Sequence, residues 1–464
     1  MRAVGIVVEP FGLVNVLRVE GIRELNRHGS LKITGMIRQE KEKEYRRMAM
    51  DEVWVKVDAV GEGGEREKFF CGLLTSIFFH KENQLSVVTL EIKTGSWLLD
   101  LDLHTRSFQQ SGISYQKIIN TCMEAAGGYA IVSEKENRKT DRWFMQYQET
   151  DWQFLSRLAS HMGVPLMAES RQSGKKLYLG YSQQEKRVMD SREDYRIEQD
   201  FGEMERKEAL NQRDVQPGDA VSYVVSSREI YSLGSRVIFE DKELLISEIR
   251  TWLKGQELYH EYRLCYPSRG ILPPYRNPAL SGASLSAWVT AVEKTMVQVE
   301  LLEDENKADC GARWLDYATV YSTPDGTGWY CMPEVGDEVR LVFPDRDEEH
   351  AYVAGSVHLG AAGGRDRPQE KYWRNKQNKE ILFTPDAIIL RNNQGLSLEL
   401  SDEEGIKLVS DKDILLQAEG QIQMKSQGEG IHMAADSKIL LQQGTARIEM
   451  SDAINIGGGK IYMN

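Results

Sequence analysis

The feature that most constrains this 464-residue chain is a short repeat that occupies residues 381–464. Each copy consists of an apolar residue, one intervening residue and a second apolar residue, and a turn follows. Because side chains at i and i+2 of a strand point to the same side, each copy predicts a three-residue strand with two side chains facing a core. The predicted core positions are Ile406, Leu408, Ile414, Leu416, Ile422, Met424, Ile431, Met433, Ile439, Leu441, Ile448 and Met450, and the pairs Ile454/Ile456 and Ile461/Met463 continue the pattern.

The spacing of the repeat favours a needle made of three chains. The copies that begin at Ile406, Ile414 and Ile422 lie eight residues apart, and a regular short period of this kind predicts a solenoid-like β-structure. It fits either a β-solenoid of one chain or an intertwined β-helix in which each layer takes one strand from each of three chains. Three chains wound around one axis leave strand edges only at the two ends, so we predict an intertwined triple-stranded β-helix and a homotrimer. Leu415 and Leu440 are apolar at intervening positions, and the pattern does not explain them.

Residues 1–266 have the pattern of mainly β-structure with inserted helices. Apolar and outward-facing residues alternate over residues 53–58, as in a strand with one buried face. Apolar residues at helical spacing over residues 115–122 predict a helix. A second helix is predicted to begin at a capping box formed by Thr150 and Gln153 and to end at Gly163.

Composition then divides the rest of the chain. Residues 267–281 contain four of the twelve prolines and predict a linker. Several short strands over residues 282–359 predict a small Greek-key barrel of the oligonucleotide/oligosaccharide-binding (OB) type. Residues 360–380 are interpreted as a connector to the needle, residues 381–464. The fold class is therefore mainly β: barrels with inserted helices, an OB-type barrel and a β-helical needle.

Charge, cysteine usage and the lack of long apolar runs argue against several classes of protein. The formal net charge is −13, which argues against a nucleic-acid binder. The five cysteines are scattered without a CxxC pair, as expected for folding in a reducing cytosol without disulfides. We find no secretory signal at the N-terminus and no apolar run near the roughly 20 residues of a membrane span. Export of the protein would therefore need another route than general secretion.

Four stretches of the sequence resemble one family. They are residues 144–151 running on to Gly163, residues 101–102 with 107–109, residues 329–339 with 353–357, and the Ile-x-Leu repeat. In this order they are similar to VgrG-type spike proteins and phage late-control D baseplate hubs. The likeness covers essentially the whole chain.

The resemblance implies a homotrimeric hub and puncturing spike at the tip of a contractile injection apparatus: a type VI secretion system, a phage tail or an R-type bacteriocin. The hub (residues 1–266) would dock the inner tube protein and baseplate subunits. A platform of Gly457, Gly458, Gly459 and Lys460 would receive a tip protein or effector. The chain would assemble in the cytoplasm and be ejected, with transient contact to a target membrane. The connector is too short for a lysozyme domain, and the chain stops at Asn464, so a bare spike is expected.

Candidate catalytic and metal-binding residues are assigned to structural roles. Asp151 and Thr150 are expected to cap a helix, Glu149 to be structural rather than catalytic, and His161 to be a last-turn cation. Residues 345–350 have the composition of a cation site but lack ligand spacing, so a solvated loop is expected. We therefore predict no enzyme activity, no metal and no cofactor.

Two other functions remain as alternatives. One is a trimeric tailspike-like enzyme that degrades polysaccharides, which would need paired carboxylates in a groove, usually with aromatic platforms. After Phe383 the repeat holds a single aromatic residue, Tyr462. The other is nucleic-acid binding by the OB-type barrel, which the acidic balance disfavours.

Overall fold

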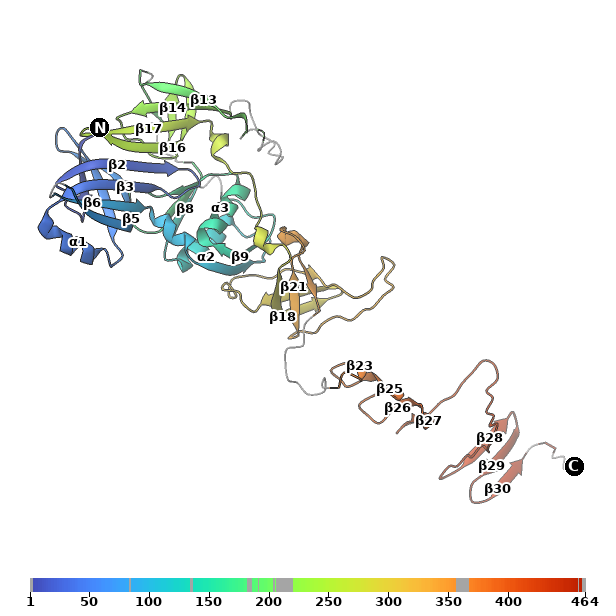
Figure 1. The fold of residues 1–464 in the computed structure, drawn as a ribbon. Coiled ribbons are helices and arrows are strands. Elements are labelled where there is room, and N and C mark those ends of the chain that lie inside the picture. Colours follow the sequence, from blue (N-terminus) through green and yellow to red (C-terminus); the bar gives the residue numbers. More distant parts are fainter. Residues whose placement is uncertain are drawn as a thin grey trace. The chain divides into compact units, whose positions relative to one another are not determined.

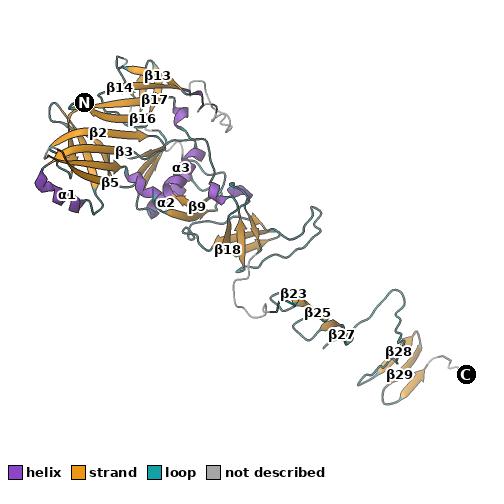
Figure 2. Ribbon diagram, viewed as in Figure 1, coloured by secondary structure: helices purple, strands orange, loops and turns teal. Residues whose placement is uncertain are grey.

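The computed structural model of the chain describes residues 3–82, 85–133, 137–181, 186–190, 192–202, 205, 220–355, 367–457 and 459–460. The chain divides into two compact units, residues 1–358 and 359–464. Strands predominate in both units, and among the described residues helices occur only in the first (Figure 2). The prediction of a mainly β fold is confirmed.

The first unit is built on one continuous sheet of twelve strands, which is antiparallel except where β12 pairs with β15. β2 and β16 pair along the middle of the sheet and join its two halves (Figure 1). A short helix, α1 (Glu42–Met48), follows the 3-10 helix η1 (Gln39–Lys41). The first half comprises β1 (Ala3–Glu9), β2 (Asn15–Glu24), β3 (Ser30–Ile37), β4 (Trp54–Gly61), β5 (Arg66–Glu82) and β6 (Leu85–Lys93). The second comprises β12 (Arg187–Val188), β13 (Tyr195–Gln199), β14 (Val221–Ser227), β15 (Arg236–Phe239), β16 (Lys242–Lys254) and β17 (Glu257–Cys265).

Each half of the sheet covers its own hydrophobic core. Val55 and Val57 of β4 are fully buried in the first core, whereas Lys56 between them is exposed. The alternation predicted for residues 53–58 is therefore confirmed. The second core contains Ile246 and Tyr262, which lie on β16 and β17.

Between the two halves the chain forms an insertion with a third core, which contains both predicted helices. In α3, Thr150 and Gln153 form the reciprocal capping box, and Gly163 ends the helix in the left-handed conformation at φ 69°. Both helix predictions are confirmed because caps and apolar spacing are local signals. The insertion comprises η2 (Gly95–Asp100), β7 (Leu103–Phe108), α2 (Tyr115–Ala125), β8 (Tyr129–Val132), β9 (Phe144–Thr150), α3 (Asp151–Met162), β10 (Leu166–Ala168) and β11 (Lys176–Leu179).

The chain then passes through two short 3-10 helices, η5 (Pro267–Gly270) and η6 (Pro278–Leu280), into a five-stranded sheet. A bridge between Tyr317 and Val353 brings the two ends of this sheet together, as a barrel requires. Its strands are β18 (Ser284–Glu293), β19 (Met296–Leu301), β20 (Leu315–Asp316), β21 (Glu338–Val342) and β22 (Tyr352–Ala354), and η7 (Glu348–His350) precedes β22.

The second unit contains two antiparallel meanders and a long segment without strands. The meanders are β23 (Lys371–Arg374), β24 (Glu380–Phe383), β25 (Ala387–Arg391), β26 (Ser397–Ser401) and β27 (Gly405–Val409), then β28 (Ile439–Gln443), β29 (Ala446–Met450) and β30 (Ile454–Gly457). Residues 410–438, all of which the structure describes, form no strand. In the single chain, residues 414–416, 422–424 and 431–433 therefore form no strand, and the strands predicted for these copies stay a prediction for the assembled needle. A strand needs a paired neighbour, and this segment has none in its own chain.

Candidate functional site

A buried arginine holds the insertion and the barrel together. Arg157 of α3 is fully buried and donates from Nε and Nη2 to the two carboxylate oxygens of Glu149, at 2.9 and 2.7 Å. Its Nη1 donates to Oε1 of Glu348 in the barrel at 2.7 Å, and Nη2 also donates to the carbonyl oxygen of Met145 at 2.9 Å. The carboxylates of Glu149 and Glu348 come from segments that are far apart in the sequence. The Arg157 cluster (Arg157, Glu149 and Glu348) is therefore a charged joint between hub and barrel.

The pKa shifts in the Arg157 cluster follow from burial and pairing. Burial raises the pKa of Glu149, and the adjacent Arg157 guanidinium opposes that shift. Burial by itself lowers the pKa of Arg157, but the two carboxylates outweigh it and raise the pKa. Arg157 is therefore charged at any ordinary pH, and its charge is compensated only while both segments stay in place.

Apolar side chains cross the same joint. Trp143 immediately precedes β9 of the insertion and Met145 lies on it, yet both side chains pack in the hydrophobic core of the barrel. The Trp143 ring lies 5.8 Å from that of Phe343, and its Nε1 donates to the carbonyl oxygen of Glu348 at 2.9 Å. The barrel core is thus completed by residues of the hub.

A second set of contacts joins β7 and the residues just after it to β19 and the barrel segment that follows β19. The backbone N–H of Ser107 donates to the Asp304 carboxylate at 3.1 Å, and Asn306 Nδ2 donates to the carbonyl oxygen of Ser107 at 2.9 Å. Gln109 Nε2 donates to the carbonyl oxygen of Val299 at 3.1 Å. Residues 107–109 and 144–163, which carry the family resemblance, therefore both lie on the hub side of the same joint.

The acidic segment of the barrel is only partly a solvated loop, contrary to prediction. Glu348 and Asp347 are buried, and Asp347 pairs with Arg142 and Arg276. Asp345 and His350 are exposed and pair with each other. The burial has a physical reason: three arginines supply the compensating charge. Among the described residues, no cluster of three or more His, Cys, Asp or Glu side chains is placed to hold a metal ion.

The residues near the ends of α3 differ in one respect from prediction. Thr150 caps the helix as predicted, and Asp151 additionally accepts hydrogen bonds from Arg106 and Gln146. Burial, reinforced by Arg157 and Arg142, lowers the pKa of His161 to about 4. His161 is therefore neutral at pH 7, and its prediction as a last-turn cation is wrong.

The second unit places part of the predicted needle core on one sheet face. In the β28–β30 meander, Ile439 pairs with Met450 and Met450 with Ile454, while Leu441 and Ile456 flank Ile448. Residues in register across a sheet share a face, so these six apolar residues lie together. The alternate positions Leu440, Glu449 and Asn455 form the opposite face.

The β23–β27 meander has a similar apolar face. Ile406 and Leu408 of β27 are in register with Leu400 and Leu398 of β26. These in turn pair with β25, and β25 with β24, which adds Ile388, Leu390, Ile381 and Phe383. On the other face Glu380 is buried and paired with Arg374 and Arg391.

The remaining predicted positions are not brought together in the single chain. Ile414, Leu416, Ile422, Met424, Ile431 and Met433 lie in the strand-free segment and are exposed. At the predicted apex, Gly457 ends β30, and Gly459 and Lys460 follow it. Gly458, Ile461 and Met463 lie outside the described residues.

Comparison with known proteins agrees with this architecture. Residues 23–222 match the family model of the phage tail baseplate hub (GPD), and residues 286–358 match that of the type VI secretion system/phage-baseplate injector OB domain. This chain belongs to the baseplate-hub and spike family of contractile injection systems. It is a hub and spike component of a type VI secretion system or phage tail. The matched families are structural parts of the injection machine. No curated protein matches the chain in sequence.

Solved hub and spike structures share the fold at low identity. One is the E. coli c3393 protein, described as a type VI secretion component similar to the T4 tail proteins gp27 and gp5. It is 14% identical, with a TM-score of 0.51 over 76% of this chain and 99% of that one. Another is the half-lidded Francisella PdpA-VgrG complex, at 10% identity and a TM-score of 0.54 over 87% of each chain. The lidded form of that complex gives 10% identity and a TM-score of 0.51, over 85% of this chain and 76% of that one.

Sequence reasoning missed the residues that form the hub–barrel joint. Arg157 interrupts the apolar face of α3 between Leu155 and Leu158, and an arginine at such a position signals a buried partner. Nothing in the sequence around Trp143 indicates in a comparable way that its side chain packs in the barrel. Within the part of the chain that the structure describes, no helix combines the length and apolar composition that a membrane crossing requires.

Proposed function

We propose that this hub–spike protein acts as a homotrimer whose residues 381–464 form an intertwined puncturing needle. The observation that carries the proposal is the exposure of the apolar faces of the second unit. Ile406 and Ile454 are 77% and 70% exposed in the single chain. Exposure of a contiguous apolar surface to water is unfavourable. Two further copies of the same segment would cover this surface with identical side chains.

The proposed partners follow from the family. We propose that the hub docks the inner tube protein and baseplate subunits, and that Gly457–Lys460 at the apex receives a tip protein or effector. Complexes of a Francisella VgrG with PdpA support a partner of this kind. We further propose assembly in the cytoplasm and ejection on contraction of the sheath, with transient contact to a target membrane.

The proposed mechanism is mechanical rather than catalytic. Force applied to the hub must reach the needle through the barrel, and the Arg157 cluster together with Trp143 resists separation of hub and barrel. A stiff joint is useful to a puncturing device, whereas it adds nothing to a tailspike-like enzyme. We therefore retain the non-enzymatic function in preference to polysaccharide degradation.

Native mass spectrometry of the full chain tests the trimer. We expect three copies of the 52.9 kDa chain. Leu416→Asp is expected to prevent trimerisation, because it would place three charges in one apolar layer. Leu415→Asp is the matched control: the neighbouring residue is also apolar and is 81% exposed, but it has the predicted outward position.

Two results would contradict the proposal. One is a wild-type chain that remains a monomer at micromolar concentration. The other is a trimer that survives Leu416→Asp as well as it survives Leu415→Asp, since the inward assignment would then be wrong.

A further inference from the structure

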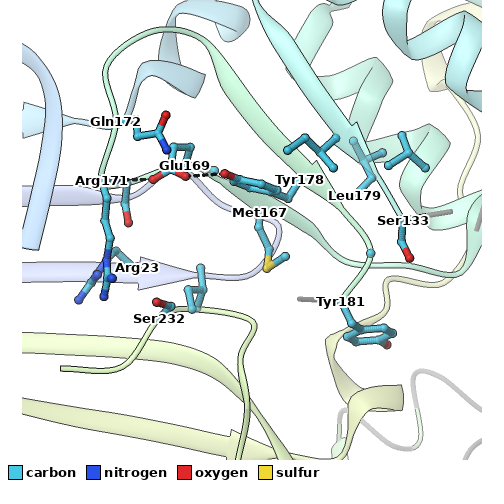
Figure 3. Close-up of a pocket in the computed structure, with 16 residues that line it drawn as sticks. Arg23, Ser133, Met167, Glu169, Arg171, Gln172, Tyr178, Leu179, Tyr181 and Ser232 are labelled. Carbon is cyan, nitrogen blue, oxygen red and sulfur yellow. Dashed lines mark hydrogen bonds between the residues drawn. The ribbon is translucent and has the colours of Figure 1, made fainter. Parts of the chain in front are cut away.

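A cavity of about 740 Å³ in the hub combines apolar walls with two arginines. It lies where the insertion meets the sheet, and its lining includes Ile131 of β8, Met167 of β10 and Leu233. Arg23 comes from β2, and Arg171 comes from the loop between β10 and β11. Figure 3 shows the Arg171 side chain reaching toward Arg23 at one end of the cavity. The joint and the needle make no use of this cavity.

Both arginines have donors without acceptors. Arg23 is only 3% exposed, and its guanidinium carbon lies 5.1 Å from the centre of the Phe69 ring. Among the described residues, neither Nη2 of Arg23 nor Nη2 of Arg171 has a hydrogen-bond partner, and both atoms are buried. A buried guanidinium donor without an acceptor is unfavourable, so these two atoms mark a place where an acceptor, from a ligand or from ordered water, would be favourable.

The charges around the arginines are not balanced. The carboxylate of Glu169 accepts hydrogen bonds from the Arg171 backbone N–H at 2.5 Å and from the Tyr178 hydroxyl at 2.8 Å. Glu169 is therefore one negative charge beside two positive ones. Burial, together with the neighbouring Arg171, lowers the pKa of Arg23 to about 10, while Tyr262 and Glu169 oppose the shift. Guanidinium groups stay protonated in proteins, so the two arginines beside the single carboxylate of Glu169 leave an excess of one positive charge.

A neutral histidine lies near the arginine pair. Burial, together with Arg23 and Arg171, lowers the pKa of His260 to about 3, so the ring is uncharged at pH 7. Its Nδ1 is 2.9 Å from the Thr251 hydroxyl, and within the described chain Nε2 has no hydrogen-bond partner. His260 therefore adds no charge that would compensate the arginines.

We propose that Arg23 and Arg171 bind an oxyanion, and that the apolar walls receive the organic part of the molecule that carries it. Guanidinium groups match the geometry of phosphate and carboxylate oxygens and pair with them bidentately. The excess of one positive charge requires a ligand with at least one negative charge. The cavity is much larger than a phosphate ion, which leaves room for the organic part next to Ile131 and Leu233.

Isothermal titration calorimetry of the full chain tests the site. Inorganic phosphate and acetate are titrated in separate arms at an ionic strength held constant with sodium chloride. We expect saturable binding of one anion per chain, and the tighter of the two arms identifies a phosphate or a carboxylate as the preferred group. Arg171→Met should weaken binding at least tenfold. Arg171→Lys should weaken it less, because it keeps the charge but loses the planar fork.

The controls separate loss of the site from loss of the fold. Arg18→Met changes an arginine of the same strand as Arg23, but its side chain is 70% exposed, so binding should be unchanged. Arg171 is on a loop and only partly buried, so Arg171→Met carries the test if Arg23→Met fails to fold. Absence of saturable binding in both arms, or equal binding by wild type and Arg171→Met, would overturn the proposal. It would also be overturned if Arg171→Met reduced the native oligomeric mass while neither anion bound, since a carboxylate of a second copy would then occupy the site.

Discussion

Replacing Arg157 by methionine should open the joint between hub and barrel. The side chain is fully buried and pairs with Glu149 and Glu348 at distances of 2.7 to 2.9 Å. Without the guanidinium, two buried carboxylates face each other with no compensating charge. Removing one partner of a buried ion pair costs about 3–5 kcal/mol. That is a large part of the roughly 5–15 kcal/mol that stabilises a typical protein.

Amide hydrogen exchange of β9 and α3 measures this loss directly, because it reports the free energy of local opening. A loss of about 3–5 kcal/mol corresponds to exchange that is roughly 150 to 5000 times faster. The pH dependence provides a second signature. With Arg157 gone, burial holds the folded pKa of Glu149 above its unfolded value, so the variant should regain stability as the pH falls and the carboxylates become protonated.

The matched control for Arg157→Met is a triple variant that also replaces Glu149 and Glu348 by methionine. Removing all three charges leaves an apolar joint, and such replacements are neutral or stabilise by about 1–4 kcal/mol. Exchange in the triple variant should therefore be much slower than in the single variant. The reasoning fails if Arg157→Met exchanges within threefold of wild type, or if the triple variant opens as readily as the single one.

Three further predictions concern the hub. Thr150→Ala removes the capping box of α3 and should lower stability by about 1 kcal/mol, seen as a lower melting temperature, whereas Thr121→Ala on the exposed side of α2 should have little effect. Gly163→Ala should cost about 1 kcal/mol through backbone strain alone, since φ is 69° and an added Cβ would meet nothing within 4 Å; an unchanged melting temperature would contradict this. The folded pKa of His260 is about 3, below its unfolded value, so wild type should lose stability as the pH falls from about 6.5 toward 3, by at most about 1.4 kcal/mol per pH unit. His260→Gln should flatten that dependence in urea titrations, and an equally steep profile would show that other groups cause it.

Local signals explain why much of the fold was predictable. The capping box at Thr150, the left-handed Gly163 and the apolar spacing of α2 act within a few residues of one another. The alternation over residues 53–58 likewise describes one strand and needs no knowledge of its neighbours. Such features are complete within a short stretch of sequence, so these helices and this strand can be predicted from the sequence alone.

The hub–barrel joint was not predictable because its partners are distant in sequence. Arg157 and Glu348 are 191 residues apart, and nothing local to either one identifies the other. Residues 345–350 are acidic and polar, which by itself indicates solvent exposure. Three arginines from other segments reverse that outcome for Asp347 and Glu348. His161 was assigned the wrong charge for the same reason, because its pKa depends on burial and on Arg157 and Arg142.

In residues 381–464, the repeat determines which side chains share a face of a strand, but it does not determine which strands pair. Alternation of side chains is a property of any strand, so the apolar residues of each copy share a face whether the strands form a meander or a β-helix. The register of Ile439, Met450 and Ile454 follows this rule. Hydrogen-bond partners obey no such rule, because they depend on which strand lies alongside, and residues 410–438 have none in their own chain. The exposed side chains of this segment, from Ile414 to Met433, continue the same apolar pattern, so the surface that would cover them must carry the pattern too. Two other copies of the same segment, as in the proposed trimer, would meet that requirement in every layer.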